Sequence, residues 1–146
     1  EEDDVEAVGL SAHLCGAGRL SLPSSLLLTP GTLTREHRDM LLDSPRVTAG
    51  IVAPMVESGC HWAQYASMVS ERLDGSGYPQ GARGTELPQD VRILSVVETY
   101  EALVSHRPYR PAHARARALH IIQAQSGLLF DGVVTDTLEG LARGEL

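Results

Sequence analysis

Apolar residues along this chain recur at helical spacing, and no segment shows the apolar and polar alternation of a β-strand. The clearest pattern follows Pro88, where Val91, Leu94 and Leu103 share one wide face and predict a helix to about Ser105. The same pattern predicts further helices over residues 4–17, 35–43, 44–59, 61–71, 112–125 and 131–143. We therefore expect an all-α fold, a bundle of about six or seven helices with two rigid loops rich in glycine and proline.

Short polar residues mark the starts of several of these helices. Asp3 or Asp4 is suited to cap the first helix, Thr34 the second and Asp131 the last. Ser44 followed by Pro45 predicts that a separate helix begins there, because proline is favoured at the first helical position. The remaining segments predict an irregular link at 20–28, a turn at 29–31 and a kink at Pro54.

Residues 71–79, Glu-Arg-Leu-Asp-Gly-Ser-Gly-Tyr-Pro, cannot continue a helix. Two glycines tolerate positive φ and the proline fixes its own φ, so we expect a compact, ordered loop. This loop would present the side chains of Arg72, Asp74, Ser76 and Tyr78 at fixed angles, although an ordinary interhelical turn would have a similar composition. A second stiff loop is expected at residues 106–111, which hold two prolines, two arginines and a tyrosine.

Composition and charge narrow the classes of function. The 146 residues are enough for one domain with its own core, and a net charge of −7 disfavours broad attraction to nucleic acid or anionic membranes. No apolar run is long enough to span a membrane, and no signal peptide is recognised, so a cytoplasmic location is expected. Cys15 and Cys60 lack the spacing of a metal site and are expected to be free thiols.

Several separated segments resemble the HD-GYP domain, a bacterial family that hydrolyses the signalling nucleotide cyclic di-GMP. The resemblance is carried by residues 18–23, 27–36, 71–79, 92–103, 107–110 and 130–134. It covers nearly the whole chain and implies an HD-type helical bundle. Residues 1–146 would then form one domain of a longer, multidomain protein.

Departures from the family fall on its metal-ligand positions. Family members resembling this chain hold two or three iron or manganese ions with His and Asp side chains. The corresponding positions here are Cys15, Gly16, Ser44, Val69, Ser70 and Glu98. Only the Cys15 thiol and the Glu98 carboxylate could act as ligands, and a hydrolytic metal needs three or more. We therefore expect no metal cofactor, with the six histidines on the surface or structural; a metal site at new positions is the alternative.

Arginines occupy positions at which the resemblance implies that the family binds anions. Arg19 stands at the position of a lysine in the family's pocket, and Arg72, Arg107 and Arg110 lie near the two stiff loops. A guanidinium group can bind phosphate with two parallel hydrogen bonds. The alternative is that these arginines fix the loops by pairing with nearby carboxylates.

These observations favour a catalytically inactive regulatory module in cyclic di-GMP signalling, a pseudo-phosphodiesterase that acts through protein contacts. The resemblance implies GGDEF-domain proteins or other signalling proteins as partners, and a homodimer is left open. Two alternatives remain at this point. The domain could sense cyclic di-GMP or another nucleotide without a metal ion, or it could be a hydrolase with an unconventional metal site.

Overall fold

The computed structural model describes residues 2–24, 26, 33–108 and 110–145. Its α-helices are α1 (Glu2–Leu14), α3 (Arg35–Glu57), α4 (Tyr65–Met68), α5 (Gln89–Val104), α6 (Arg115–Gln123) and α7 (Gly132–Arg143). Three short 3-10 helices are η1 (Ala17–Ser21), η2 (His61–Gln64) and η3 (Gly84–Glu86). The described residues form no strand, only isolated bridges, so the predicted all-α class is confirmed.

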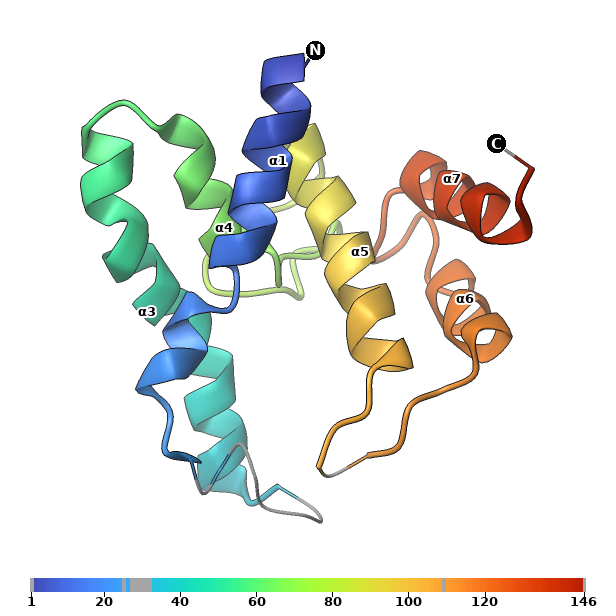
Figure 1. The fold of residues 1–146 in the computed structure, drawn as a ribbon, viewed down its shortest axis with the longest axis horizontal. Coiled ribbons are helices and arrows are strands. Elements are labelled where there is room, and N and C mark those ends of the chain that lie inside the picture. The colour runs from blue at the N-terminus through green and yellow to red at the C-terminus, as the bar shows by residue number, and fades with distance from the viewer. Residues whose placement is uncertain (1, 25, 27–32, 109, 146) are drawn as a thin grey trace.

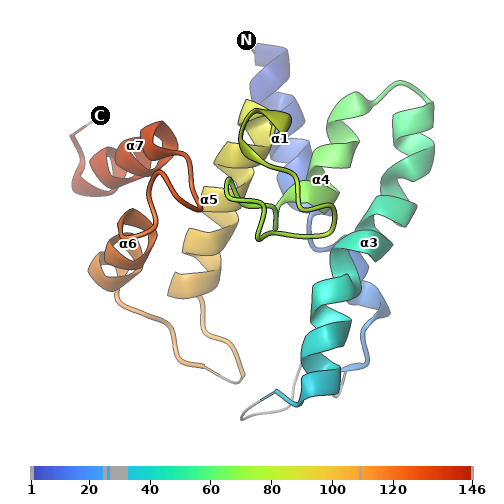
Figure 2. The same ribbon diagram turned by 180° about the vertical axis from the view of Figure 1, so that it is seen from behind.

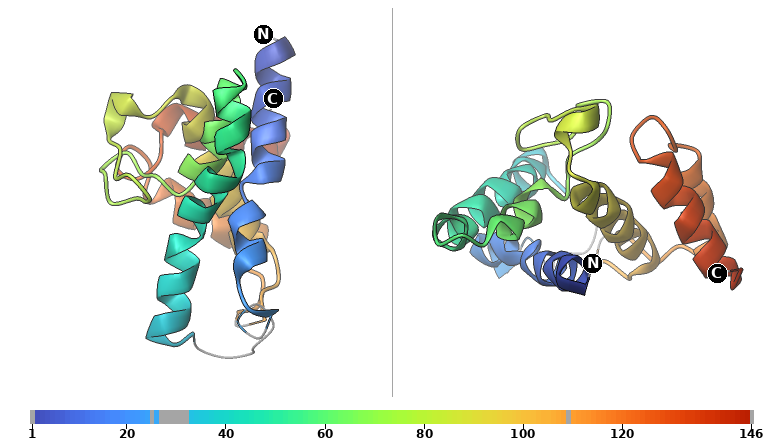
Figure 3. Two further views of the ribbon diagram at one scale, coloured as in Figure 1. Left: turned by 90° about the vertical axis from the view of Figure 1, so that its left-hand side faces the viewer. Right: turned by 90° about the horizontal axis from the view of Figure 1, so that it is seen from above.

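Helix α5 lies in the middle of the bundle (Figure 1). Helices α1, α3 and α4 lie on one side of it, and α6 and α7 pack against the other side and against each other. Seen from behind, the long loop between α4 and α5 runs across α4 and α5 (Figure 2). From above, this loop stands out from one face of the bundle, with α7 far from α3 (Figure 3).

Helix α3 continues through both of its prolines, so the prediction of two helices meeting at Ser44 is wrong. Pro45 has no N–H for the carbonyl of Leu41 four residues earlier. The hydroxyl of Ser44 donates to that carbonyl instead, at 2.8 Å. A side chain thus replaces the missing backbone bond and lets the helix continue.

Other helix boundaries agree in part with the sequence pattern. The Thr34 hydroxyl accepts from the His37 N–H and Asp131 accepts from the Val133 N–H, so both predicted caps are confirmed. Helix α1 is described from Glu2, and the side chains of Asp3 and Asp4, the predicted caps, lie outside the described part of the chain. The predicted helix over 61–71 is shorter and divided between η2 and α4, because its last residues turn into the loop. The turn predicted at 29–31 lies outside the described residues.

Two groups of buried apolar side chains flank α5. The first is formed by Met68, Leu87 and Val91, and the second by Val96, Ile122 and Phe130. The first group holds the α4–α5 loop against the bundle, and the second joins α5 to α6 and α7. Both edges of the bundle are therefore anchored on one helix.

The loop at residues 71–79 is organised around the carboxylate of Glu71, which has no exposed surface. Its two oxygens accept the N–H groups of Gln80 and Ala82, at 2.7 and 3.1 Å. Gly77 passes so close to this residue that a Cβ there would overlap the Glu71 Cα. A single buried side chain thus replaces the backbone partners that an irregular loop lacks.

Replacing Glu71 by Gln should lower the free energy of unfolding by about 2 kcal/mol, because a carboxamide has one acceptor oxygen for two buried N–H donors. Urea denaturation measures this change. The exposed Glu101→Gln is the matched control and should change stability by less than about 0.5 kcal/mol. Equal midpoints for Glu71→Gln and the unmodified protein would contradict this account of the loop.

Candidate active site

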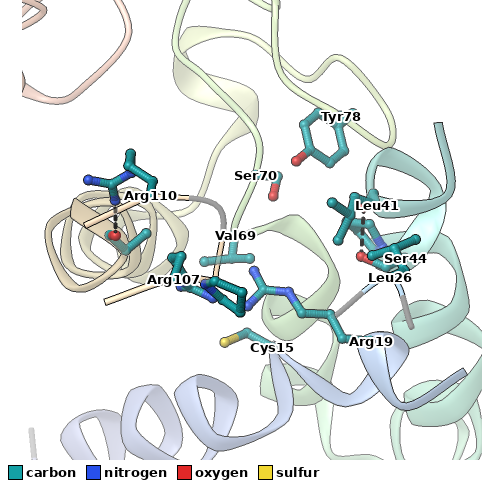
Figure 4. A pocket seen from close by; sticks show the side chains of 13 residues that line it. Cys15, Arg19, Leu26, Leu41, Ser44, Val69, Ser70, Tyr78, Arg107 and Arg110 are labelled. Atoms are coloured by element: carbon teal, nitrogen blue, oxygen red, sulfur yellow. Dashed lines mark hydrogen bonds between the residues drawn. The ribbon is translucent and has the colours of Figure 1, made fainter. Parts of the chain in front are cut away.

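A cavity of about 270 Å³ opens between η1, α3, the end of α4 and the loop that follows α5 (Figure 4). Its walls are formed by Cys15, Arg19, Leu26, Leu41, Ser44, Pro45, Val69, Ser70, Tyr78, Ala102, Arg107, Pro108 and Arg110. These residues come from four separate segments of the chain. The tertiary fold, and no single motif, therefore creates the site.

Most of the predicted metal-ligand positions do meet at this cavity. Cys15, Ser44, Val69 and Ser70 line it. Glu98 lies behind Cys15 and contacts it, whereas Gly16 is not among the lining residues. The fold thus brings four of the six positions together at one cavity, with Glu98 in contact with its wall.

Two guanidinium groups extend into the cavity. Figure 4 shows the side chains of Arg19 and Arg107 reaching toward each other above Cys15. Neither side chain makes a hydrogen bond or an ion pair with a described residue. Two like charges that converge in this way favour an anion between them.

Arg110 also lines the cavity, but it is turned toward α5 (Figure 4). Its guanidinium donates to the carbonyls of Ala102 and Leu103, at 2.6 and 3.3 Å. Those carbonyls belong to the last turn of α5, where a positive charge is favourable. Arg110 therefore fixes the loop at 106–111 to the end of this helix.

Arg72 points into the protein, so the prediction that its side chain projects from the loop is wrong. Its guanidinium donates to the carbonyls of Val69 and Glu71 and lies 5.1 Å from the ring centre of Phe130. Burial lowers the pKa of Arg72, and the nearby Tyr78, Glu71 and Asp74 oppose that change. The side chain supports the loop from beneath.

Asp74 and Ser76 lie at the exposed tip of the same loop, away from the cavity. The Asp74 carboxylate accepts from the N–H and the hydroxyl of Ser76, at 2.9 and 2.6 Å, and these bonds hold the pKa of Asp74 below its usual value. Hydrogen bonds therefore hold both Arg72 and Asp74 in place. Of this loop, only Tyr78 among the predicted contacts reaches the cavity.

The alternative that the loop arginines pair with carboxylates is also wrong for those whose partners are described. Arg72 and Arg110 bind mainly backbone carbonyls, because the loops they support expose unpaired C=O groups. An arginine–carboxylate pair does occur at Arg92, which binds Asp131 at 3.1 Å and also the carbonyls of Gly84 and Leu87.

Cys15 and Glu98 form a thiol–carboxylate pair at the cavity wall. The Cys15 thiol donates to the Glu98 carboxylate at 2.8 Å. Burial raises the pKa of Cys15 to about 12, the bond to Glu98 and the charge of Glu98 raise it as well, and Arg19 opposes them. The thiol is therefore protonated at neutral pH and is a poor nucleophile.

A metal centre of the kind used by the HD-GYP family does not fit the residues that meet here. Within the described part of the chain, no three His, Cys, Asp or Glu side chains are placed to hold one ion, and this includes the histidines. A metal ion in this cavity would need ligands in addition to Cys15 and Glu98.

Several cavity residues were not predicted from sequence, among them Leu26, Leu41, Ala102 and Pro108. Apolar side chains of this kind give no signal that distinguishes a cavity wall from a core. Thr48, directly behind the wall, was also missed, since a threonine within a helix is usually read as a solvent-facing residue.

The family assignment agrees with this geometry. The HD domain family model matches residues 1–134, and the chain belongs to this family. It is 34% identical over 94% of its length to the cyclic di-GMP phosphodiesterase response regulator RpfG of Xanthomonas campestris, and 32% identical over 90% of its length to a cyclic di-GMP phosphodiesterase of Vibrio cholerae. It is 28% identical over 81% of its length to the 3'3'-cGAMP-specific phosphodiesterase 1 of V. cholerae. The matched regions cover 36%, 28% and 27% of these relatives, so the chain spans about a third of their length.

These relatives correct the prediction that the domain is a catalytically inactive module. All three relatives are named phosphodiesterases, and this similarity points to a hydrolase. The prediction of a pseudo-enzyme depended on the side chains at six positions. Substitutions at those positions do not by themselves establish that the activity is lost.

No helix in the described part of the chain is long and apolar enough to cross a bilayer. A cytoplasmic location stays a prediction.

The reaction of Cys15 with iodoacetamide tests the thiol–carboxylate pair. With Cys60 replaced by Ala, Cys15 is the one thiol left. At pH 9 only about one thiol in a thousand is ionised if its pKa is about 12, so alkylation should be slow and should still accelerate at pH 11.

Glu98→Gln removes the negative charge beside the thiol and should make alkylation faster at pH 9. A rate that levels off near pH 9 in the parent protein, or that is unaffected by this change, would contradict the described pair.

Proposed function

We propose that this HD domain binds a cyclic dinucleotide in the cavity and hydrolyses one of its phosphodiester bonds. Cyclic di-GMP is the first substrate to test and 3'3'-cGAMP the second, because both are named as substrates of relatives. The observation that carries the proposal is the convergence of Arg19 and Arg107 on one cavity. A phosphodiester bears one negative charge and two free oxygens, which suit a pair of guanidinium groups.

The size of the cavity limits how a dinucleotide can bind. Pockets that enclose a drug-sized ligand usually measure about 300–1,000 Å³. At about 270 Å³ this cavity suits one phosphate with its sugar, and the remainder of the ligand would lie outside. The hydroxyls of Tyr78 and Ser70 stand at its wall and can donate to ligand oxygens.

In the proposed reaction, an oxygen of water forms a bond to phosphorus while one ester P–O bond breaks. The leaving ribose oxygen takes up a proton from solvent, and a linear dinucleotide results. Arg19 and Arg107 would stabilise the charge that develops on the phosphoryl oxygens. We assign Glu98 as the acceptor of the proton from water, because its carboxylate is hydrogen-bonded to Cys15 in the cavity wall. Since the described residues do not form a metal centre, no step is assigned to a metal ion.

The chain is proposed to act as one domain of a longer protein. Binding to GGDEF-domain proteins or to a second copy of this chain stays a prediction. Contacts through the loop at 71–79 would involve Asp74, Ser76 and Tyr78, since Arg72 faces inward.

An assay with cyclic di-GMP and, separately, 3'3'-cGAMP tests the proposed activity. Each is incubated with the protein in Mn²⁺, in Fe²⁺ or in EDTA, and the products are separated by anion-exchange chromatography. We expect a linear dinucleotide in at least one condition. Intact substrate in every condition, after prolonged incubation at high protein concentration, would overturn the proposal.

Replacing Arg19 by Ala should reduce kcat/KM about 10- to 100-fold, the loss expected for a charged hydrogen-bonded contact to phosphate. Arg107→Ala should have a similar effect. Arg115→Ala, which removes an exposed arginine on α6 outside this cavity, is the control and should leave turnover unchanged. An equal loss in the control would show that the effect is one of total charge.

Glu98→Gln should reduce kcat by about 100-fold or more while ligand affinity changes little, because it removes the proton acceptor and leaves both arginines in place. Calorimetry gives the affinity and the chromatographic assay gives kcat. Full turnover in this variant would remove Glu98 from the mechanism.

A further inference from the structure

Arg19 is carried by η1, which is joined to α3 by a buried contact. The backbone N–H of Gly18 donates to the Thr48 hydroxyl at 2.9 Å, and this hydroxyl donates in turn to the Ser44 carbonyl at 3.3 Å. Thr48 is 1% exposed, and Gly18 is buried as well. The residue next to Arg19 is thus bound to α3, which forms the adjoining wall of the cavity.

The packing at this contact leaves no room for a side chain at Gly18. A Cβ at Gly18 would overlap the carbonyl oxygen of Ser44, so the backbone of η1 lies directly on α3. A short 3-10 helix has little cooperative stability of its own and takes its orientation from its contacts. The direction of the Arg19 side chain therefore depends on where the Thr48 hydroxyl holds Gly18.

We propose that Thr48 is a positioning residue for Arg19, which holds η1 at the angle that directs the guanidinium into the cavity. This inference rests on the proposed function in one respect: the anion that Arg19 would bind is a phosphate of a cyclic dinucleotide. Thr48 itself is not among the residues that line the cavity. Its effect on binding must therefore pass through Arg19.

A double-mutant cycle measures this dependence. Thr48→Val keeps the shape of the side chain and removes the hydroxyl, whereas Thr48→Ser keeps the hydroxyl. Each is made alone and together with Arg19→Ala, and the affinity for cyclic di-GMP is measured by calorimetry, with the integrity of the nucleotide checked after each titration.

We expect Thr48→Val to weaken binding at least about fivefold in the parent protein and by less than about twofold when Arg19 is already Ala. Thr48→Ser should bind within about twofold of the parent. Equal losses from Thr48→Val in both backgrounds, or no loss in either, would overturn the inference.

A second measurement needs no nucleotide. Burial raises the pKa of Cys15, and the charge of Arg19 opposes that increase. In the Cys60→Ala background, Arg19→Ala should slow the alkylation of Cys15 at pH 9, and Thr48→Val should slow it too if it displaces Arg19. General loosening of the fold would expose the thiol and accelerate alkylation, so a faster rate in Thr48→Val would overturn the inference.

The two measurements also separate this inference from the proposed function. If the protein neither binds nor cleaves a cyclic dinucleotide, the proposed function fails. The alkylation rates would then still show whether Thr48 controls the position of Arg19.

Discussion

The buried carboxylate of Glu71 is the interaction on which the surroundings of the cavity depend. It accepts two loop N–H groups in a place that water does not reach, and Gly77 permits the backbone to pass directly over it. Because the loop is wrapped on this side chain, Tyr78 stands at the cavity and Arg72 lies beneath the loop against Phe130. A polar group held in a dry environment is costly unless it is fully bonded, so its partners have little freedom to move.

Much of the helical framework could be predicted from the sequence, because caps and apolar spacing are local signals. Thr34 and Asp131 cap helices as expected, and the helix after Pro88 ends one residue before the expected position. The prediction of a helix start at Ser44 was wrong because a Ser-Pro pair is compatible both with a helix start and with a proline inside a helix. The bond from Ser44 to the Leu41 carbonyl decides between them, and such a bond is visible only in three dimensions.

The candidate site was predicted less completely, for a different reason. The resemblance identified positions that do converge, but the direction of a long side chain depends on the packing around it. Arg72 and Arg19 look alike in the sequence, yet one is drawn inward by carbonyls and an aromatic ring, and the other extends into a cavity. The prediction of inactivity had the same weakness. It treated a count of metal ligands as a measure of activity, and the phosphodiesterases among the relatives contradict it.

The exposed tip of the loop at 71–79 has a consequence for recognition. Asp74 and Ser76 already satisfy one another, so a protein that docks there would have to break those bonds before it could form its own. Such an exchange yields little net free energy. Beside the tip, Tyr78 and Pro79 border a shallow groove with Leu42, Asp43 and Arg46 of α3. Selectivity on this face would therefore come from the fit of a partner's surface to the groove. The polar tip would act mainly by excluding partners whose surfaces collide with it.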